Sequence, residues 1–208
     1  YPYSEPYEGI NYIRNSIKVI IDAYDGTVNF YLIDGHDPVA ETYSRMFPGL
    51  FKSANELPDG FAEHLRYPEG IFDLQLQVYK KYHVTNPKIF YNREDEWIIA
   101  GEDPSSQDGG STIEGTRNKG RAVEPSYVVM KLPGGVREEF TLISYYTPPG
   151  RDNMASWLGA RMDGGDYGKL IVYKFPKDKV TYGPSQFKSR VNQDTTISKE
   201  ISLWEFIY

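Results

Sequence analysis

An acidic turn with a histidine, Asp34-Gly35-His36-Asp37, is the densest group of side chains in the sequence that could bind a metal ion. Carboxylate oxygens are the ligands that Ca²⁺ and Mg²⁺ prefer, and an imidazole nitrogen would add a ligand suited to a transition metal. The same residues also fit an ordinary turn and helix cap, because Asp and Gly favour turns and Asp accepts hydrogen bonds from the first helical amides. We favour the turn and cap over a Ca²⁺ or Mg²⁺ site at Asp34, His36 and Asp37, and we expect no cofactor.

A second candidate site follows the segment Pro148-Pro149-Gly150, where Arg151, Asp152 and Asn153 precede an expected helix. The first amides of a helix lack internal partners and favour negative charge. Together with Arg151 they could bind an anionic group of a lipid, a glycan or a protein partner. Asp152 or Asn153 could instead cap the helix and occupy part of its positive end. The cap is the simpler interpretation, and the anion site is the alternative.

Common catalytic motifs are missing from the sequence. It has no Gly-x-Ser-x-Gly elbow, no His-Glu-x-x-His helix, no P-loop and no Gly-x-Gly-x-x-Gly fingerprint. Glu94-Asp95-Glu96 offers close carboxylates, but consecutive residues do not face one another across a substrate as a glycosidase pair must. The 18 tyrosines fit sheet and core positions better than a glycan- or peptide-binding surface. An enzyme is therefore not the function we expect.

Composition narrows the class of partner. A formal net charge of −6 argues against a nucleic-acid-binding protein, because duplex binding needs clustered Lys and Arg. The lack of cysteine excludes disulfides and thiolate chemistry. Residues 169–190 carry six Lys or Arg and one Asp, which could lie near anionic lipid, although a solvated face is the simpler interpretation. The longest apolar run has four residues, far below the roughly 20 that a membrane-spanning helix needs.

The elements that must position these residues begin with a hairpin. Apolar residues alternate over 17–21 and 28–32, and Asp25-Gly26 between them favours a type I′ turn. A helix is predicted over 37–47, since proline suits the first helical position. A wide apolar stripe over 68–82 predicts a second helix that is deeply packed.

The second half of the sequence predicts further strands and helices. Met154, Trp157, Leu158 and Met162 recur at helical spacing, so we expect a helix that begins at Asp152 or Asn153 and ends at Gly164-Gly165. A second hairpin turns at Pro133-Gly134-Gly135. We expect strands at 97–100, 127–132, 140–146 and 170–175, a short helical turn after Asn86, and two C-terminal helices, one after Pro184 and one capped by Asp194.

Residues 101–121 are rich in Gly and Ser and predict a mobile loop. The segments on either side look like strands of one sheet, so we prefer a single domain over 1–208 with an inserted loop to two domains. The fold class that we predict is α+β. It has a mostly antiparallel sheet, built from two hairpins plus further strands, packed with about five or six helices.

Several sequence blocks, which run in order along nearly the whole chain, are distinctive. They include Tyr12-Ile13-Arg14-Asn15-Ser16-Ile17-Lys18, Phe47-Pro48-Gly49-Leu50-Phe51, His64-Leu65-Arg66-Tyr67-Pro68-Glu69, Phe90-Tyr91-Asn92-Arg93-Glu94-Asp95, Lys131-Leu132-Pro133-Gly134, Arg151-Asp152-Asn153-Met154 and Tyr182-Gly183-Pro184. In these blocks the chain resembles uncharacterised protein family 0182, large bacterial proteins with several transmembrane helices and a long extracytoplasmic region.

The resemblance implies a location rather than an activity. It implies a segment on the extracytoplasmic side of the cell membrane, tethered to the transmembrane portion of a multi-pass protein. The missing initiator Met and signal peptide also suggest an excised piece of a larger protein. We expect an interaction or sensory module whose further partner is an envelope protein, a glycan or a lipid head group. The alternative is an extracytoplasmic hydrolase acting on cell-envelope glycan or peptide.

Overall fold

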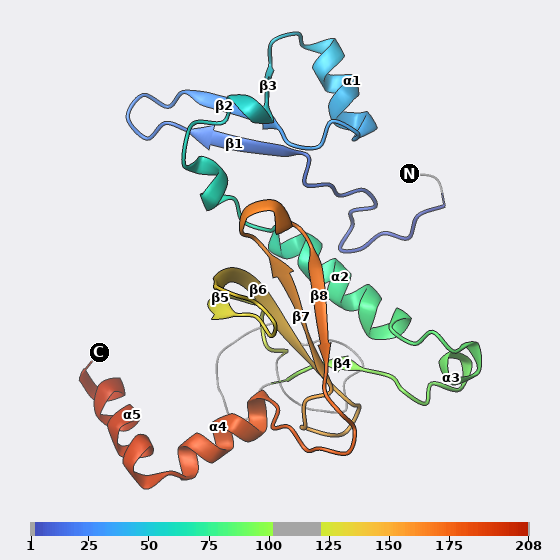
Figure 1. Ribbon diagram of the computed structural model, residues 1–208, viewed down its shortest axis with the longest axis vertical. Coiled ribbons are helices and arrows are strands. Elements are labelled where there is room, and N and C mark those ends of the chain that lie inside the picture. The colour runs from blue at the N-terminus through green and yellow to red at the C-terminus, as the bar shows by residue number, and fades with distance from the viewer. Residues whose placement is uncertain (1–2, 102–121, 208) are drawn as a thin grey trace. The chain divides into compact units, whose positions relative to one another are not determined.

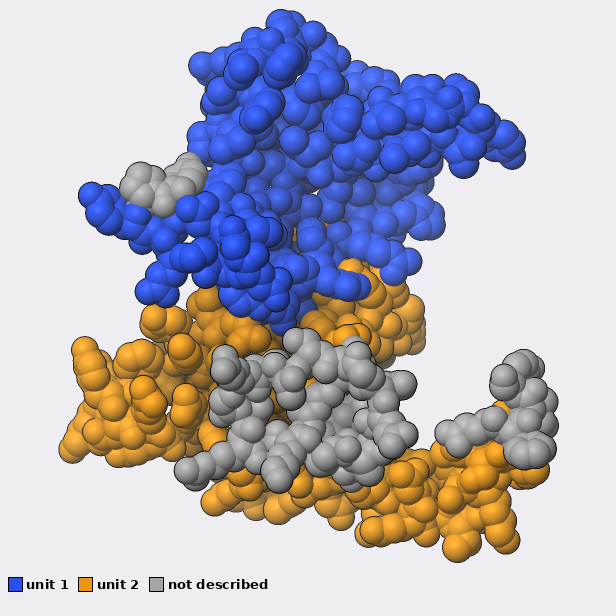
Figure 2. All heavy atoms as spheres, turned by 180° about the vertical axis from the view of Figure 1, so that it is seen from behind, with its two compact units in different colours: residues 1–74 blue, residues 75–208 orange. Residues whose placement is uncertain are grey.

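The computed structural model describes residues 3–207 apart from 102–121 (Figure 1). The chain separates into two compact units, residues 1–74 and 75–208, which Figure 2 colours separately. The boundary falls within helix α2 (Glu69–Tyr82), and each unit contains a sheet of its own. The single-domain organisation expected from the sequence stays a prediction. Apart from Gly101, the loop predicted at 101–121 lies outside the described residues.

The first unit begins with the predicted hairpin. Strands β1 (Ile17–Ile21) and β2 (Val28–Leu32) pair antiparallel, which confirms the hairpin. The predicted type I′ turn is wrong. Asp22 exchanges backbone hydrogen bonds with Thr27 and Gly26, each 2.9 Å long, so a four-residue loop turns the chain. In this loop only Gly26 has a positive φ, 76°, whereas a type I′ turn needs positive φ at both central residues.

The first unit continues with a crossover that returns to the same sheet. Helix α1 (Pro38–Met46) starts after its N-cap Asp37, as predicted. Strand β3 (Phe51–Ser53) then pairs parallel with β2, and parallel neighbours need such a crossover. Two short 3₁₀ turns, η1 (Ala54–Glu56) and η2 (Phe61–His64), lead to α2.

The second unit contains a five-stranded antiparallel sheet (Figure 1). Its strands are β4 (Ile98–Ile99), β5 (Ser126–Lys131), β6 (Glu138–Thr147), β7 (Ser156–Arg161) and β8 (Leu170–Lys174). The order is β4-β6-β7-β8, and β5 also pairs with β6. Because β7 occupies the other edge of β6, β4 and β5 lie end to end along one edge.

The two strands that flank the segment 102–121 therefore belong to one sheet, as the sequence predicted. Their inner ends meet at an antiparallel bridge between Gly101 and Ala122. Beside it, the Val123 amide donates a 2.8 Å hydrogen bond to the Ala100 carbonyl. The chain thus leaves the sheet and returns to it at directly opposed residues.

The predicted helix from Asp152 or Asn153 to Gly164-Gly165 is wrong, because this segment contains strand β7 and the short 3₁₀ turn η3 (Gly164–Asp166). β7 is a central strand between β6 and β8. Trp157 and Leu158 are both buried although successive side chains in a strand point to opposite faces. A strand buried on both faces lacks polar alternation, so its apolar residues can match helical spacing by coincidence.

The two faces of this sheet bury different cores. On one face Leu132, Ile143 and Trp157 form a hydrophobic cluster. On the other face the Tyr146 hydroxyl donates a 3.0 Å hydrogen bond to the Leu76 carbonyl of α2, and both residues are fully buried. The part of α2 from residue 75 onward therefore covers this second face.

Three further helices complete the second unit. Helix α3 (Pro87–Asn92) is capped by Asn86, and α4 (Pro184–Gln193) precedes α5 (Thr195–Ile207), whose first amides bond to Asp194. These helices confirm the sequence prediction. The predicted α+β class with mostly antiparallel strands is confirmed, with five α-helices in the described chain. The strands form two sheets rather than one.

Candidate functional site

A cleft of about 650 Å³ lies in the second unit, where strands β6 and β8 end and strand β7 begins. Its lining residues come from three segments, 93–97 between α3 and β4, 148–155 between β6 and β7, and 174–179 at the end of β8. These segments are far apart in the sequence. Antiparallel pairing of the strands brings them to the same end of the sheet.

Cationic residues outnumber acidic residues in the lining of this cleft. Five cationic and three acidic residues line it, although the chain has a net charge of −6. An excess of positive charge in a cleft attracts anions. We call it the basic cleft. Its cationic residues are Arg93, Arg151, Lys174, Lys177 and Lys179, and its acidic residues are Glu94, Asp95 and Glu96.

The cations of the basic cleft differ in their contacts. Lys177 Nζ lies 3.0 Å from Asp95 Oδ2, and Lys174 Nζ lies 5.5 Å from the ring centroid of Trp97. Arg93, Arg151 and Lys179 are exposed and form no ion pair with any described residue. These three side chains are therefore the ones best placed to meet an external anion.

Local sequence fixes the α3 side of the basic cleft. The Asn86 side chain caps α3 by accepting a 2.9 Å hydrogen bond from the Lys88 amide. Arg93 ends the helix in the left-handed conformation, with φ 54° and ψ 37°. Glycine usually occupies this position, and a residue with a side chain costs on the order of 1 kcal/mol there. The conformation turns the chain so that residues 93–97 form one wall of the cleft.

The structure places the predicted candidates Arg151, Asp152 and Asn153 in the segment between β6 and β7. Because no helix starts there, both the predicted cap and the helix-based anion site are wrong. The basic cleft nevertheless includes Arg151 and Asn153, whereas Asp152 is not among its lining residues. Asn153 is held by an antiparallel bridge to Tyr182. Ligand binding by Arg151 and Asn153 stays a prediction, now supported by neighbouring lysines instead of helix amides.

The predicted metal candidates lie in the first unit and make structural contacts. Asp37 is buried, caps α1 and accepts hydrogen bonds from the Ser16 and Tyr12 hydroxyls. Burial raises the pKa of Asp37, but these hydrogen bonds and those from the helix amides outweigh it, so the pKa is lowered. Asp34 accepts a 2.9 Å hydrogen bond from the His36 amide. Among the described residues, no three His, Asp or Glu side chains are grouped to hold a metal ion.

An aromatic cluster behind the basic cleft was not predicted from the sequence. It contains Tyr79, His83, Trp97 and Tyr146. The rings of His83 and Trp97 stack with centroids 3.6 Å apart and an interplanar angle of 13°. Trp97 also lines the basic cleft, so the cluster supports its wall. Tyr79, Trp97 and Tyr146 lie in the predicted helix and strands, but the sequence pattern did not indicate that they meet, and it did not place His83 among buried residues.

The histidine of this cluster is buried and neutral. Its Nδ1 lies 3.0 Å from the Lys80 carbonyl and 3.2 Å from the Tyr79 carbonyl, so Nδ1 carries the proton. Burial lowers the pKa of His83, and the charge of Lys174 acts in the same direction, against the Tyr79 carbonyl and Asp95. His83 therefore remains uncharged at neutral pH, which suits packing better than acid–base chemistry.

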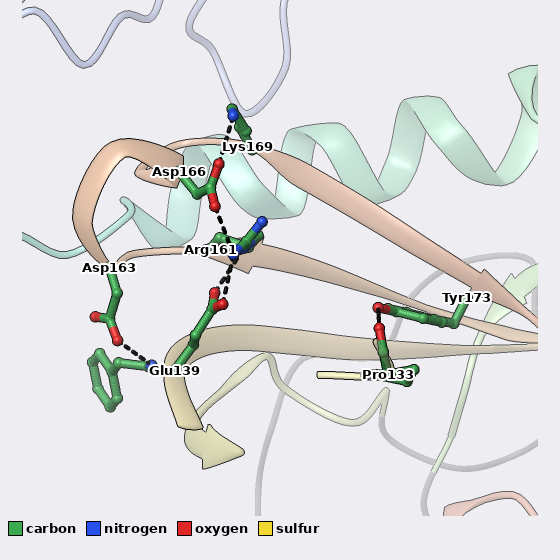
Figure 3. Close-up of polar contacts among 8 residues, drawn as sticks. Pro133, Glu139, Arg161, Asp163, Asp166, Lys169 and Tyr173 are labelled. Carbon is green, nitrogen blue, oxygen red and sulfur yellow. Dashed lines mark hydrogen bonds and ion pairs between the residues drawn. The ribbon is translucent and has the colours of Figure 1, made fainter. Parts of the chain in front are cut away.

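A charged network lies at the opposite end of the same sheet (Figure 3). Arg161 donates two hydrogen bonds to the buried Glu139 carboxylate, 2.7 and 2.5 Å long, and its Nη2 lies 2.7 Å from Asp166 Oδ2. Lys169 Nζ lies 2.5 Å from Asp166 Oδ1. Opposite charges pair throughout, so the network joins β6, β7 and the turn between β7 and β8. Sequence patterns did not predict this network, because the pairing depends on strand register.

No helix in the described part of the chain combines the length and hydrophobicity that crossing a bilayer requires. Comparison with known proteins identifies a family whose members this chain resembles. The family model described as "Uncharacterised protein family (UPF0182)" matches residues 1–204. The chain is 45% identical over 207 residues to a UPF0182 protein of Desulforamulus reducens, covering 99% of this chain and 21% of that protein.

Other bacterial relatives show the same pattern. A UPF0182 protein of Microcystis aeruginosa is 49% identical over 205 residues, covering 98% of this chain and 20% of the relative. One of Clostridium acetobutylicum is 48% identical over 204 residues, covering 98% and 21%. The chain thus spans about a fifth of the length of these curated relatives, and no solved structure matches it. On the family match and these identities, the chain belongs to the uncharacterised protein family UPF0182.

Proposed function

We propose that this chain is an interaction module on the extracytoplasmic side of a multi-pass membrane protein, and that its basic cleft binds an anionic group. One observation carries the binding role: five cations from three separate segments converge in one cleft of an acidic chain. Family membership and the much greater length of the relatives support the membrane context. The transmembrane portion of the same protein is the first partner in this proposal.

The side chains of the basic cleft suit recognition of a phosphate, sulfate or carboxylate. The Arg151 guanidinium presents a planar fork of donors that matches these groups, and the Lys179 ammonium adds a point charge. Asn153 adds an amide that can donate a neutral hydrogen bond. A lipid head group, a glycan or an envelope protein could each carry such an anion.

Catalysis has less support than binding. A glycosidase needs two carboxylates that face one another across the substrate. Glu94, Asp95 and Glu96 all come from one segment of consecutive residues, and Asp95 pairs with Lys177. No described feature of the basic cleft therefore favours the hydrolase alternative.

Inorganic phosphate should stabilise this chain through Arg151. At ten times its dissociation constant, phosphate adds about 1.4 kcal/mol to the free energy of unfolding, because it binds only the folded state. We expect a melting temperature about 3 °C higher in phosphate than in potassium chloride of equal ionic strength. Arg151→Ala should remove this increment, and the exposed Arg190→Ala, outside the cleft, should keep it. If phosphate and chloride act alike on the unaltered chain, the cleft is not an anion site.

The proposed location can be tested by labelling, because the chain has no cysteine. Val136, which is 94% exposed, is replaced by cysteine in cells that produce the membrane protein carrying this chain. A membrane-impermeant maleimide should label Val136→Cys in intact cells, with the protein lacking the substitution as background. The fully buried Leu142→Cys should react only after unfolding. Labelling of Val136→Cys only after lysis would place the segment in the cytoplasm.

A further inference from the structure

A second hollow lies beside the basic cleft in the same unit. It has a volume of about 380 Å³ and opens where the start of α4 and the two residues before it meet β6 and Met154, which precedes β7. Its lining is mainly apolar, unlike that of the cleft, and we call it the apolar pocket. The residues that give it this character are Val123, Tyr145, Met154, Tyr182, Pro184 and Phe187.

Met154 lines both hollows. Its amide donates a 2.8 Å hydrogen bond to the Thr181 carbonyl, and the preceding Asn153 forms the bridge to Tyr182. These backbone contacts hold Asn153 and Met154 in position between the two hollows. Asn153 lies on the cleft side and Tyr182 on the pocket side. A ligand that reaches past Met154 would contact cations at one end and apolar side chains at the other.

We infer that the anionic group bound by the basic cleft is the head of a lipid-like amphiphile, whose apolar part occupies the apolar pocket across Met154. This inference rests on the proposed function and names its ligand class. Charge complementarity orients the ligand, since the anionic head lies among the lysines and arginines. Phe187 and Tyr182, 64% and 52% exposed, gain apolar contact when the pocket is filled. A pocket of this volume with few polar groups is typical of small-molecule sites.

Three soluble probes separate the contributions of head and tail. They are dihexanoyl phosphatidic acid, glycerol 3-phosphate and dihexanoyl phosphatidylcholine, each titrated calorimetrically into the chain below its micellar concentration. We expect phosphatidic acid to bind at least tenfold more tightly than glycerol 3-phosphate, because only its acyl chains fill the apolar pocket. It should also exceed phosphatidylcholine, whose head group carries no net charge.

Substitutions locate the two ends of the ligand. Phe187→Ser should lower the affinity for phosphatidic acid to within threefold of that for glycerol 3-phosphate, and leave glycerol 3-phosphate binding unchanged. Tyr182→Ser is a second variant of the same kind. Arg151→Ala should lower the affinity for both phosphatidic acid and glycerol 3-phosphate. Val129→Ser is the matched control, because Val129 is 68% exposed on β5 and lines neither hollow.

The outcomes distinguish this inference from the proposed function. Equal affinities for phosphatidic acid and glycerol 3-phosphate would contradict the inference that the ligand is an amphiphile, but would still support anion binding by the basic cleft. If phosphatidic acid still binds more tightly than glycerol 3-phosphate in both Phe187→Ser and Tyr182→Ser, its acyl chains do not occupy the apolar pocket. Tighter binding of an acidic peptide with apolar residues than of phosphatidic acid would make the occupant a protein segment and overturn the lipid class. Binding of none of these anions removes both proposals.

Discussion

Gly183→Ala is expected to lower the free energy of unfolding by about 3 kcal/mol, at the upper end of the usual cost of overpacking. A Cβ atom at this position would lie 2.0 Å from the Asp152 carbonyl oxygen, well inside contact distance. The backbone conformation of Gly183 does not cause this cost, because its φ of −80° is accessible to alanine. The only relief is to separate the two segments, which breaks the 2.8 Å hydrogen bond from the Met154 amide to the Thr181 carbonyl.

Urea denaturation of Gly183→Ala measures this cost against a matched glycine. Gly165→Ala, in the same unit, would place its Cβ within 4 Å of no other atom and has no left-handed backbone. It should therefore remain within about 0.5 kcal/mol of the unaltered chain. Equal midpoints for the two variants would show that the chain does not approach this closely at Gly183. Loss of this approach should also disturb the wall that the cleft and pocket share.

Arg161→Met should cost about 3 kcal/mol, because it leaves the buried Glu139 carboxylate without its partner. The Glu139 side chain is only 8% exposed, so water cannot replace the two hydrogen bonds from the guanidinium. Loss of the Arg161 charge costs less at Asp166, because Lys169 still forms an ion pair with it. The penalty therefore comes mainly from one uncompensated charge in the sheet.

Two further variants test this explanation by denaturation. Adding Glu139→Gln to Arg161→Met should recover at least half of the loss, since the buried charge is then removed. Arg45→Met breaks a pair of the same 2.5 Å length with Glu41, but these side chains are 78% and 53% exposed. Its cost should stay below about 0.5 kcal/mol. Equal costs for Arg45→Met and Arg161→Met would contradict a role for burial.

The sequence predicted the elements whose signals are local. Asp37, Asn86 and Asp194 all cap helices, because a cap depends only on the next two or three amides. The two hairpins formed around glycine-containing turns for the same reason. Local patterns failed at β7, where packing on both sides removed the polar alternation by which a strand is recognised.

The candidate site depends on longer distances in the sequence. Arg151 was singled out for a helix that does not exist, and it lines the basic cleft because the end of β6, the start of β7 and the end of β8 lie at the same end of the sheet. Asp95 and Lys177 meet there across 82 positions of sequence, a separation that no local pattern bridges. Register likewise decides the pairing of Glu139 with Arg161. The spacing of residues along the sequence therefore could not predict the cleft lining or the ion pairs, because both depend on how the strands pair.

The opposed pair Gly101 and Ala122 makes the edge of the five-stranded sheet a natural insertion point. Strands β4 and β5 are each held by their own pairing with β6, so neither register depends on how many residues separate them. Doubling the length between two fixed ends costs only about 0.6 kcal/mol in closure entropy. The pairing of the sheet that carries the cleft should therefore tolerate a change in the number of residues between Gly101 and Ala122.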